Sequence, residues 1–196
     1  MLTEITRKLK ISILLLLILS LLTGIIYPGC ITLIAQIIFP WTANGSLIKN
    51  NGKWVGSSLI GQTFSNSKYF WGRPSATPIF PYNPLQSGGS NMAISNPDYI
   101  KILKERADYL RANHADTQAP IPVELLTASG SGLDPHISPA AAYYQVPRIA
   151  KARNIPESQI LTLVNNNIIS RTFKIFGEPH VNVLELNLAL DAKNYA

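Results

Sequence analysis

The N-terminal part of the chain carries one long apolar run. Three basic residues lie within the first ten positions, and no further charge occurs before Lys49. A helix needs about 20 apolar residues to cross a bilayer, so we predict a single transmembrane helix over residues 11–34, tilted or bent near Pro28. The remainder of the run, up to Pro40, is too short for a second crossing. It should extend the first helix or lie at the membrane interface.

The charges around this run predict its orientation. Arg7, Lys8 and Lys10 precede it, and positive residues are retained on the cytoplasmic side of a membrane. We therefore predict a cytoplasmic tail over residues 1–10 and place everything after the helix outside. A cleaved secretory signal is the alternative, although the apolar run continues past any plausible cleavage position and no A-x-A site closes it.

The pattern after the membrane segment is that of a globular domain. We expect an interfacial linker over residues 35–45 and an extracytoplasmic domain over 46–196, which is long enough to bury a core. Asn51-Gly52 between two apolar runs predicts a β-hairpin. Residues 64–91 are rich in proline, glycine, serine and aromatic residues, which predicts an ordered but irregular segment. Four aromatic side chains should pack this segment: Tyr69, Phe70, Trp71 and Phe80.

Capping signals predict three helices in this domain. Asn96 followed by Pro97 starts the first, and Ser138 followed by Pro139 starts the second. Pro147 should kink the second helix or divide it into two pieces. The stretch NIPESQILTLVNNNI predicts the third. One face of the first helix should carry its apolar side chains: Ile102, Leu103, Tyr109 and Leu110.

The last apolar run, VNVLELNLALD, alternates along the chain. Its leucines at 184, 186, 188 and 190 fall on one side of an extended backbone, which predicts a half-buried strand. The predicted fold class is therefore an α+β exported domain anchored by a single N-terminal transmembrane helix.

Composition excludes some classes of function. The formal net charge is +6, and the basic residues beyond Lys49 are scattered rather than clustered, so we expect no nucleic-acid binding. Cys30 is the only cysteine, which excludes an intrachain disulfide. The domain must hold together by burial and hydrogen bonding.

The segment TASGSGLDPHISPAAA, residues 127–142, contains the residue types of a serine hydrolase. The residue types of a catalytic triad are all present, in Ser129, Ser131, Asp134 and His136. However, a triad converges from separate parts of a fold, and neither serine lies in a G-x-S-x-G elbow. We therefore predict no catalytic residues here, and expect Asp134 to start a turn before proline.

The histidines and the glycine-serine loops raise the question of a metal site and a phosphate site. His114, His136 and His180 stand far apart in the sequence and lack ligand spacing, so no metal site is predicted. The Gly130–Gly132 loop runs toward a helix start, where anions are favoured, and SGGSN at 87–91 is similar. No G-x-x-x-x-G-K-[ST] motif occurs. A turn followed by a helix cap is the simpler interpretation of each loop.

Several stretches together resemble one family, the C subunit of the Kdp potassium-transporting P-type ATPase. The most specific is the run PVELLTASGSGLDPHISPAAAYYQVPRIAKARN, and the resemblance spans nearly the whole chain. The other matching stretches are GSLI at 45–48, VGSSLIGQTF at 55–64, YFWGRPSA at 69–76, SGGSN at 87–91, SNP at 95–97 and FGEPHVNVLELNLALD at 176–191.

The resemblance implies a non-catalytic subunit of an ATP-driven, high-affinity potassium importer in the bacterial inner membrane. Its implied partners are a channel-like A subunit, an ATP-hydrolysing B subunit and a small F subunit. The implied role is assembly or stabilisation of the complex, together with action as a catalytic chaperone for the B subunit. In keeping with an accessory role, no D-K-T-G phosphorylation motif occurs in this chain.

The resemblance also implies an alternative in which the subunit contacts ATP directly. The positions involved would be Ser87, Gly88, Gly89 and Gln145, with ATP reached through the complex and no cofactor held firmly by this chain. The charge rule places the domain on the side opposite cytoplasmic ATP, and we follow the charge rule.

The run from 129 to 136 is expected to contact a partner rather than to act as an active site. A stand-alone exported hydrolase or ligand-binding module using Asp134 and His136 is the third possibility. The residues assigned to the candidate partner-contact loop are Ser129, Gly130, Ser131, Gly132, Asp134 and His136.

Overall fold

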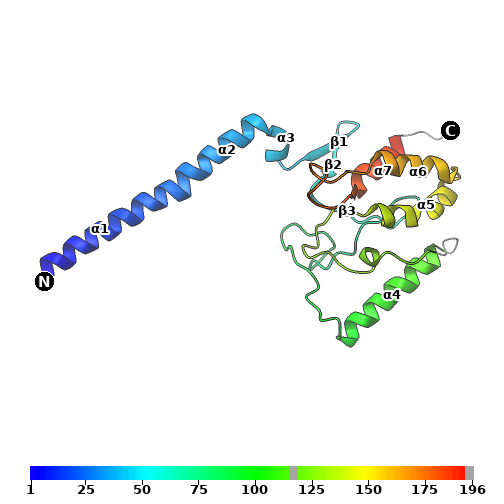
Figure 1. Cartoon of the computed structure of the whole chain (residues 1–196), viewed down its shortest axis with the longest axis horizontal. Coiled ribbons are helices and arrows are strands. Elements are labelled where there is room, and N and C mark those ends of the chain that lie inside the picture. Colours follow the sequence, from blue (N-terminus) through cyan, green and yellow to red (C-terminus); the bar gives the residue numbers. More distant parts are fainter. Residues whose placement is uncertain (115–118, 193–196) are drawn as a thin grey trace. The chain divides into compact units, whose positions relative to one another are not determined.

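The computed structural model describes residues 1–114 and 119–192, and the chain divides into two units, Met1–Leu47 and Ile48–Ala196. Figure 1 shows the order of the elements. The first unit is helical. Its elements are α1 (Leu2–Leu21), a π-helical turn (Leu22–Ile26), α2 (Tyr27–Ile38) and the short α3 (Pro40–Ala43).

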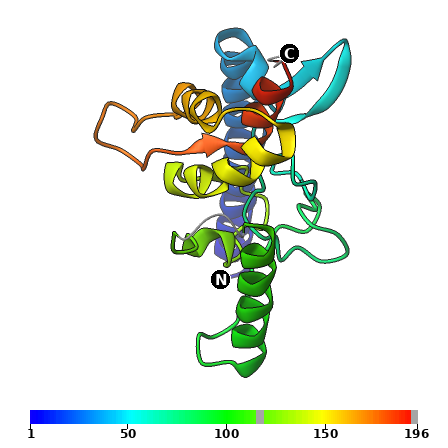
Figure 2. The ribbon, with the colours of Figure 1, turned by 90° about the vertical axis from the view of Figure 1, so that its right-hand side faces the viewer.

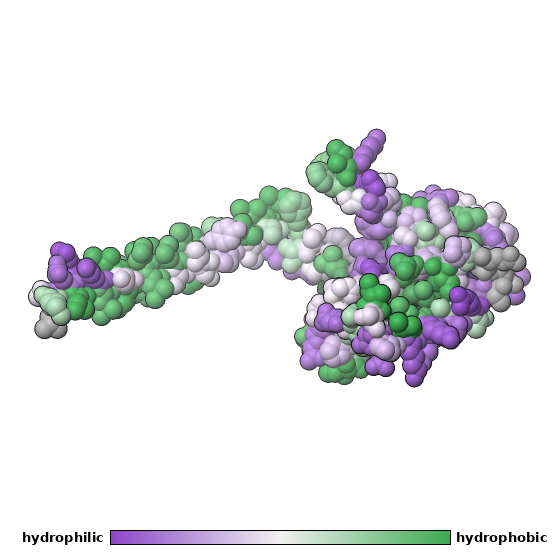
Figure 3. Space-filling model, turned by 60° about the horizontal axis from the view of Figure 1, so that its bottom comes forward, coloured by the Kyte–Doolittle hydropathy of each residue, from purple (hydrophilic) through white to green (hydrophobic). Residues whose placement is uncertain are grey.

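One helical stretch, Thr3–Ile38, is long and apolar enough to cross a membrane. Apolar side chains cover most of its surface, and hydrophilic ones gather near its N-terminal end (Figure 3). The π-helical turn lies just before Pro28, which has no N–H and whose ring clashes with the carbonyl four residues earlier, at Gly24. The helix widens there and continues, so the first four residues of the predicted linker are helical.

The second unit begins with the predicted hairpin. β1 (Leu47–Asn50) and β2 (Lys53–Ser57) form a two-stranded sheet, and Asn51 and Gly52 have φ angles of 49° and 77°, as a tight hairpin turn requires. An irregular segment then leads to α4. The remaining elements are α4 (Pro97–Asn113), a 3-10 turn (Val123–Leu125), β3 (His136–Ile137), α5 (Pro139–Arg153), α6 (Glu157–Asn166), β4 (Val181–Asn182) and α7 (Val183–Ala192).

The predicted helix starts are confirmed. The Asn96 side chain accepts a hydrogen bond from the Asp98 N–H at 2.9 Å, and Ser138 Oγ accepts one from the Ala141 N–H at 3.2 Å. A proline occupies the first turn of each helix. The third predicted helix is α6, which begins at Glu157.

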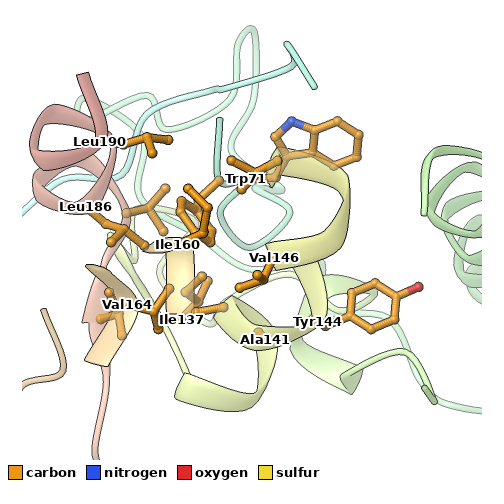
Figure 4. Close-up of a cluster of buried hydrophobic side chains, with 14 of the residues drawn as sticks. Trp71, Ile137, Ala141, Tyr144, Val146, Ile160, Val164, Leu186 and Leu190 are labelled. Carbon is orange, nitrogen blue, oxygen red and sulfur yellow. The ribbon is translucent and has the colours of Figure 1, made fainter. Parts of the chain in front are cut away.

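The core lies where α5, α6 and α7 pack together beside the small sheet of β3 and β4 (Figure 4). These strands are antiparallel and pair His136 with Asn182 and Ile137 with Val181. Phe70 and Trp71 of the irregular segment join the same cluster. The fully buried aliphatic side chains of this core include Ile137, Ile149, Ile160, Leu163, Leu186 and Leu190.

The predicted C-terminal strand is wrong. Only Val181 and Asn182 are extended, and α7 starts at Val183. The Asn182 side chain accepts a hydrogen bond from the Glu185 N–H at 3.2 Å, which caps the helix. Leu186 and Leu190, which fit an alternating pattern, are also four residues apart and lie on one helical face. The pattern is therefore compatible with both structures, and the Asn182 cap favours the helix.

Of the two effects predicted for Pro147, the structure excludes division of the helix, because α5 runs through it from Pro139 to Arg153. Phe80 does not pack the irregular segment, since half of its surface is exposed, and Tyr82 is buried there in its place. On α4, Tyr109 is more than half exposed but stacks on Trp71, and Leu110 and Ala107 are buried.

Candidate functional site: two paired glycine-serine loops

The two glycine-serine loops, SGGSN at 87–91 and SGSG at 129–132, lie against each other. The Gly88 N–H and the Ser87 hydroxyl both donate to the Ser131 carbonyl, at 2.8 and 2.9 Å. Gly132 has a φ of 69°, and a Cβ built on it would lie 2.6 Å from the Gly88 carbonyl oxygen. A side chain at Gly132 would thus both strain the backbone and separate the loops.

The serines of the second loop serve its own backbone. Ser129 Oγ accepts a hydrogen bond from the Gly132 N–H at 2.9 Å, and Ser131 Oγ accepts one from the Leu133 N–H at 3.1 Å. Such contacts are typical of turns. The N–H groups of Gly88, Gly132 and Leu133 are therefore already hydrogen-bonded within the two loops.

Asp134 ties this loop to the irregular segment. One of its oxygens accepts from the His136 N–H at 3.0 Å, which forms the predicted turn, and the other pairs with Arg73 Nη1 at 3.0 Å. Burial raises the pKa of this carboxyl, but hydrogen bonds from His136 and Arg73 outweigh it and leave the pKa below its ordinary value. Asp134 is consequently a carboxylate with a structural ion pair.

Two of the histidines come together, contrary to the expectation from the sequence. The rings of His136 and His180 are 4.5 Å apart in a T-shaped arrangement, because β3 and β4 pair next to each other. His136 Nδ1 lies 3.5 Å from Asp134, and His180 Nδ1 lies 2.9 Å from the Glu178 carbonyl oxygen. Among residues 1–114 and 119–192 no group of three or more histidine, cysteine or acidic side chains could hold a metal ion.

Gln145 lies in the core. The hydrogen bonds of its side chain do not involve the two glycine-serine loops. It is 0% exposed. Its side-chain oxygen accepts from the Trp71 N–H and from Arg148 Nη2, both at 2.8 Å, and its amide nitrogen donates to the carbonyls of Trp71 and Ala141. The glutamine thereby fastens the irregular segment to α5.

Arg148 extends this network. None of the partners described for its guanidinium is a carboxylate. Its guanidinium donates to the carbonyls of Ser67 and Tyr69 and to His114 Nε2, and stacks 4.0 Å from the centre of the Trp71 ring. Burial lowers the pKa of Arg148 to about 10 and that of His114 to about 4. Sequence reasoning missed this pair, since a buried arginine and histidine 34 positions apart leave no local signal.

A cavity of about 460 Å³ separates α4 from the irregular segment. The Nε atom of Arg73 is buried in its wall without a hydrogen-bond partner, and Arg106 Nη1 donates to the Leu126 carbonyl at 2.7 Å. Burial lowers the pKa of Arg106. The apolar part of the lining includes Phe64, Trp71, Tyr82, Ile102, Leu110 and Leu125. Apolar side chains and two arginines line this cavity together, a mixture that is common in ligand-binding pockets.

Comparisons with known proteins identify the family. The family model described as "KdpC: K+-transporting ATPase, c chain" matches residues 9–192. A potassium-transporting ATPase KdpC subunit of Burkholderia orbicola is 54% identical over 179 residues, which cover 91% of this chain and 93% of that protein. The KdpC subunit of Yersinia enterocolitica is 51% identical, with 95% and 94% coverage. That of Herpetosiphon aurantiacus is 54% identical, with 88% and 89% coverage.

The family model covers both the apolar helix and the globular domain. The chain therefore belongs to the KdpC family, the accessory c chain of K+-transporting ATPases.

Proposed function

We propose that this subunit stabilises the assembled ATPase from the non-cytoplasmic face of the bacterial inner membrane. Its partners in this proposal are the channel-like A subunit, the ATP-hydrolysing B subunit and the small F subunit. The distribution of charge supports this orientation, because Arg7, Lys8 and Lys10 precede the apolar helix and Lys49 is the next charged residue.

The observation that carries the proposal is that the polar groups of the candidate site form hydrogen bonds with other groups of this chain. Gly88, Gly132 and Leu133 donate their N–H groups to other parts of the same two loops. Gln145 is buried and fully hydrogen-bonded. A rigid pair of loops is a suitable platform for a partner protein, since little conformational entropy is lost on docking.

In this proposal the effect on ATP affinity of the B subunit is indirect. The domain favours the assembled conformation of the complex, and the cytoplasmic subunit binds nucleotide better in that conformation. No cofactor is held firmly by this chain.

The test is reconstitution of potassium-stimulated ATPase activity from the other subunits with and without this chain. We expect that the complex formed without it is unstable in detergent and inactive, and that adding the full chain restores activity. Equal potassium-stimulated activity without the chain would refute the proposal.

Direct ATP contact through Ser87, Gly88, Gly89 and Gln145 is the second candidate. It makes a different prediction for Ser87→Ala, which removes a hydroxyl from the exposed edge of the first loop. Indirect action predicts an unchanged apparent KM for ATP in the assembled complex, as for the matched control Ser65→Ala on the exposed surface. A several-fold rise in KM confined to the Ser87 variant would favour direct contact.

A stand-alone hydrolase is least supported, because Ser129 and Ser131 hold their own backbone turns. The full chain should show no esterase or peptidase activity that His136→Ala abolishes.

A further inference from the structure

The segment between α6 and β4 forms a hairpin with an apolar tip. It projects from the side of the domain and is drawn in orange in Figure 2. Phe173, Ile175 and Phe176 at its tip are 83%, 72% and 65% exposed. Three large exposed apolar side chains thus lie within four residues, whereas exposed apolar residues on most protein surfaces are scattered singly. We call these three residues the apolar tip.

Hydrogen bonds hold this hairpin in one conformation. Thr172 and Phe176 exchange two backbone hydrogen bonds of 2.9 Å, and Ile169 and His180 exchange two of 2.8 and 3.1 Å. Between these pairs, Arg171 Nη2 and Glu178 Oε2 are 2.6 Å apart. The tip is therefore a pre-organised structure.

The turn itself is strained. Phe173 and Lys174 have φ angles of 52° and 63°, a region that residues with a side chain rarely adopt. Glycine or asparagine would form this turn at lower cost. The sequence instead places a phenylalanine and a lysine there, and neither side chain is buried in this chain. The fold leaves both side chains exposed, so both are accessible to a partner.

The base of the hairpin is anchored in the candidate site. His180 contacts the His136 ring, and β4 follows directly and pairs with β3. The hairpin is therefore attached to the core at its base.

Membership of a family of ATPase subunits favours a protein pocket over a lipid surface as the partner of the tip. Lys174 stands between Phe173 and Ile175, so a pocket that takes these apolar side chains must also accommodate an ammonium group. An acidic side chain at the rim of the pocket would pair with it. A fixed, strained shape also suits a fitted pocket, whereas insertion into lipid requires no particular shape.

We propose that the apolar tip docks into an apolar pocket with an acidic rim on another subunit of the K+-transporting ATPase. This inference rests on the proposed function, in which the chain assembles with those subunits. Phe173 and Phe176 enter the pocket, and Lys174 pairs with the acidic rim.

The test measures binding of the purified full chain to the complex of the other subunits, by titration of potassium-stimulated ATPase activity. Since buried aromatic anchors dominate interface energy, we expect that Phe173→Ser with Phe176→Ser raises the apparent Kd at least about tenfold. Lys174→Glu should also weaken binding, and added salt should weaken binding of this variant less than that of the wild-type chain.

Matched controls separate this proposal from the proposed function. Ile79→Ser with Leu85→Ser removes two apolar side chains that are 86% and 89% exposed on a different loop, and should leave the Kd unchanged. Unaltered near-ultraviolet circular dichroism of the Phe173 and Phe176 variant will show that its fold is kept.

If the wild-type chain restores activity and the Phe173 and Phe176 variant binds equally well, the docking proposal is wrong and the assembly function stands. The proposal is also wrong if that variant loses binding to vesicles of phosphatidylglycerol while its binding to the other subunits is unchanged. A wild-type chain that does not restore activity contradicts the assembly function itself.

Discussion

Protonation of His114 should destabilise this domain, and the structure sets the size of the effect. His114 is 3% exposed, its Nδ1 lies 2.8 Å from the Leu110 carbonyl oxygen, and its Nε2 accepts a hydrogen bond from Arg148 at 2.9 Å. The ring is therefore neutral, with its proton on Nδ1. A second proton on Nε2 would face the Arg148 guanidinium at hydrogen-bond distance.

The sign and magnitude follow from the two pKa values of His114. Burial and the nearby charge of Arg148 lower its pKa from 6.5 in the unfolded chain to about 4 in the folded one, and together they outweigh the hydrogen bond to the Leu110 carbonyl, which raises it. The unfolded state then binds more protons between these values, so the contribution to stability is complete above about pH 6.5 and is lost as the pH falls toward 4. Between pH 7.5 and pH 5.0 the loss is about 2 kcal/mol.

The assay compares the full chain with His114→Gln in detergent micelles by urea unfolding at both pH values, followed by tryptophan fluorescence. Glutamine does not titrate, and its amide can donate to Leu110 and accept from Arg148. We expect the free energy of unfolding of the wild-type chain to fall about 2 kcal/mol more than that of the variant. An equal fall in both proteins would refute the reasoning, because other groups would then carry the pH dependence.

The remaining predictions concern the fold. Gly132→Ala should lower the free energy of unfolding by about 2 kcal/mol or more, measured by urea unfolding, since its Cβ would meet the Gly88 carbonyl at a positive φ. Leu186→Ala should cost about 2–5 kcal/mol because the side chain is fully buried, whereas the partly exposed Leu188→Ala should cost clearly less, and equal costs would contradict the helical face of α7. Asn182→Ala should cost about 1 kcal/mol and lower the far-ultraviolet helical signal, and an unchanged signal would argue against the cap.

Local chemistry made several elements predictable from the sequence. Asn96 and Ser138 cap helices through side-chain hydrogen bonds to residues two or three positions later, and Asn51-Gly52 turns the hairpin by its own backbone preference. Each of these interactions is complete within a few residues. The amino-acid types therefore specify them before any tertiary contact forms.

The C-terminal run shows why periodicity alone was insufficient. Leucines at every second position also place pairs four residues apart, so a strand and a helix compete for the same pattern. The signal that distinguishes them was present in Asn182 and Glu185, whose spacing matches a helix start. At Pro147 the local signal was misleading. The helix α5 continues through this residue despite the local tendency of proline to end a helix.

The candidate site depended on contacts between distant segments. The pairing of Ser87 and Gly88 with Ser131 joins residues 43 or 44 positions apart, and the contact of His136 with His180 follows from the register of β3 and β4. Neither contact has a local signature. The resemblance to the family identified the right segments, but the burial of Gln145 and the network around Arg148 emerged only from the fold.

The side of the membrane on which the domain lies tests the central claim most directly. In a Cys30→Ser background, a single cysteine at Lys104, which is exposed on α4, can be labelled in intact spheroplasts with a membrane-impermeant maleimide. A cysteine at Thr3, in the N-terminal tail, is the matched control. We predict that the cysteine at position 104 is labelled in intact spheroplasts and that the one at position 3 is labelled only after lysis. The reverse pattern would contradict the account and place the domain beside cytoplasmic ATP.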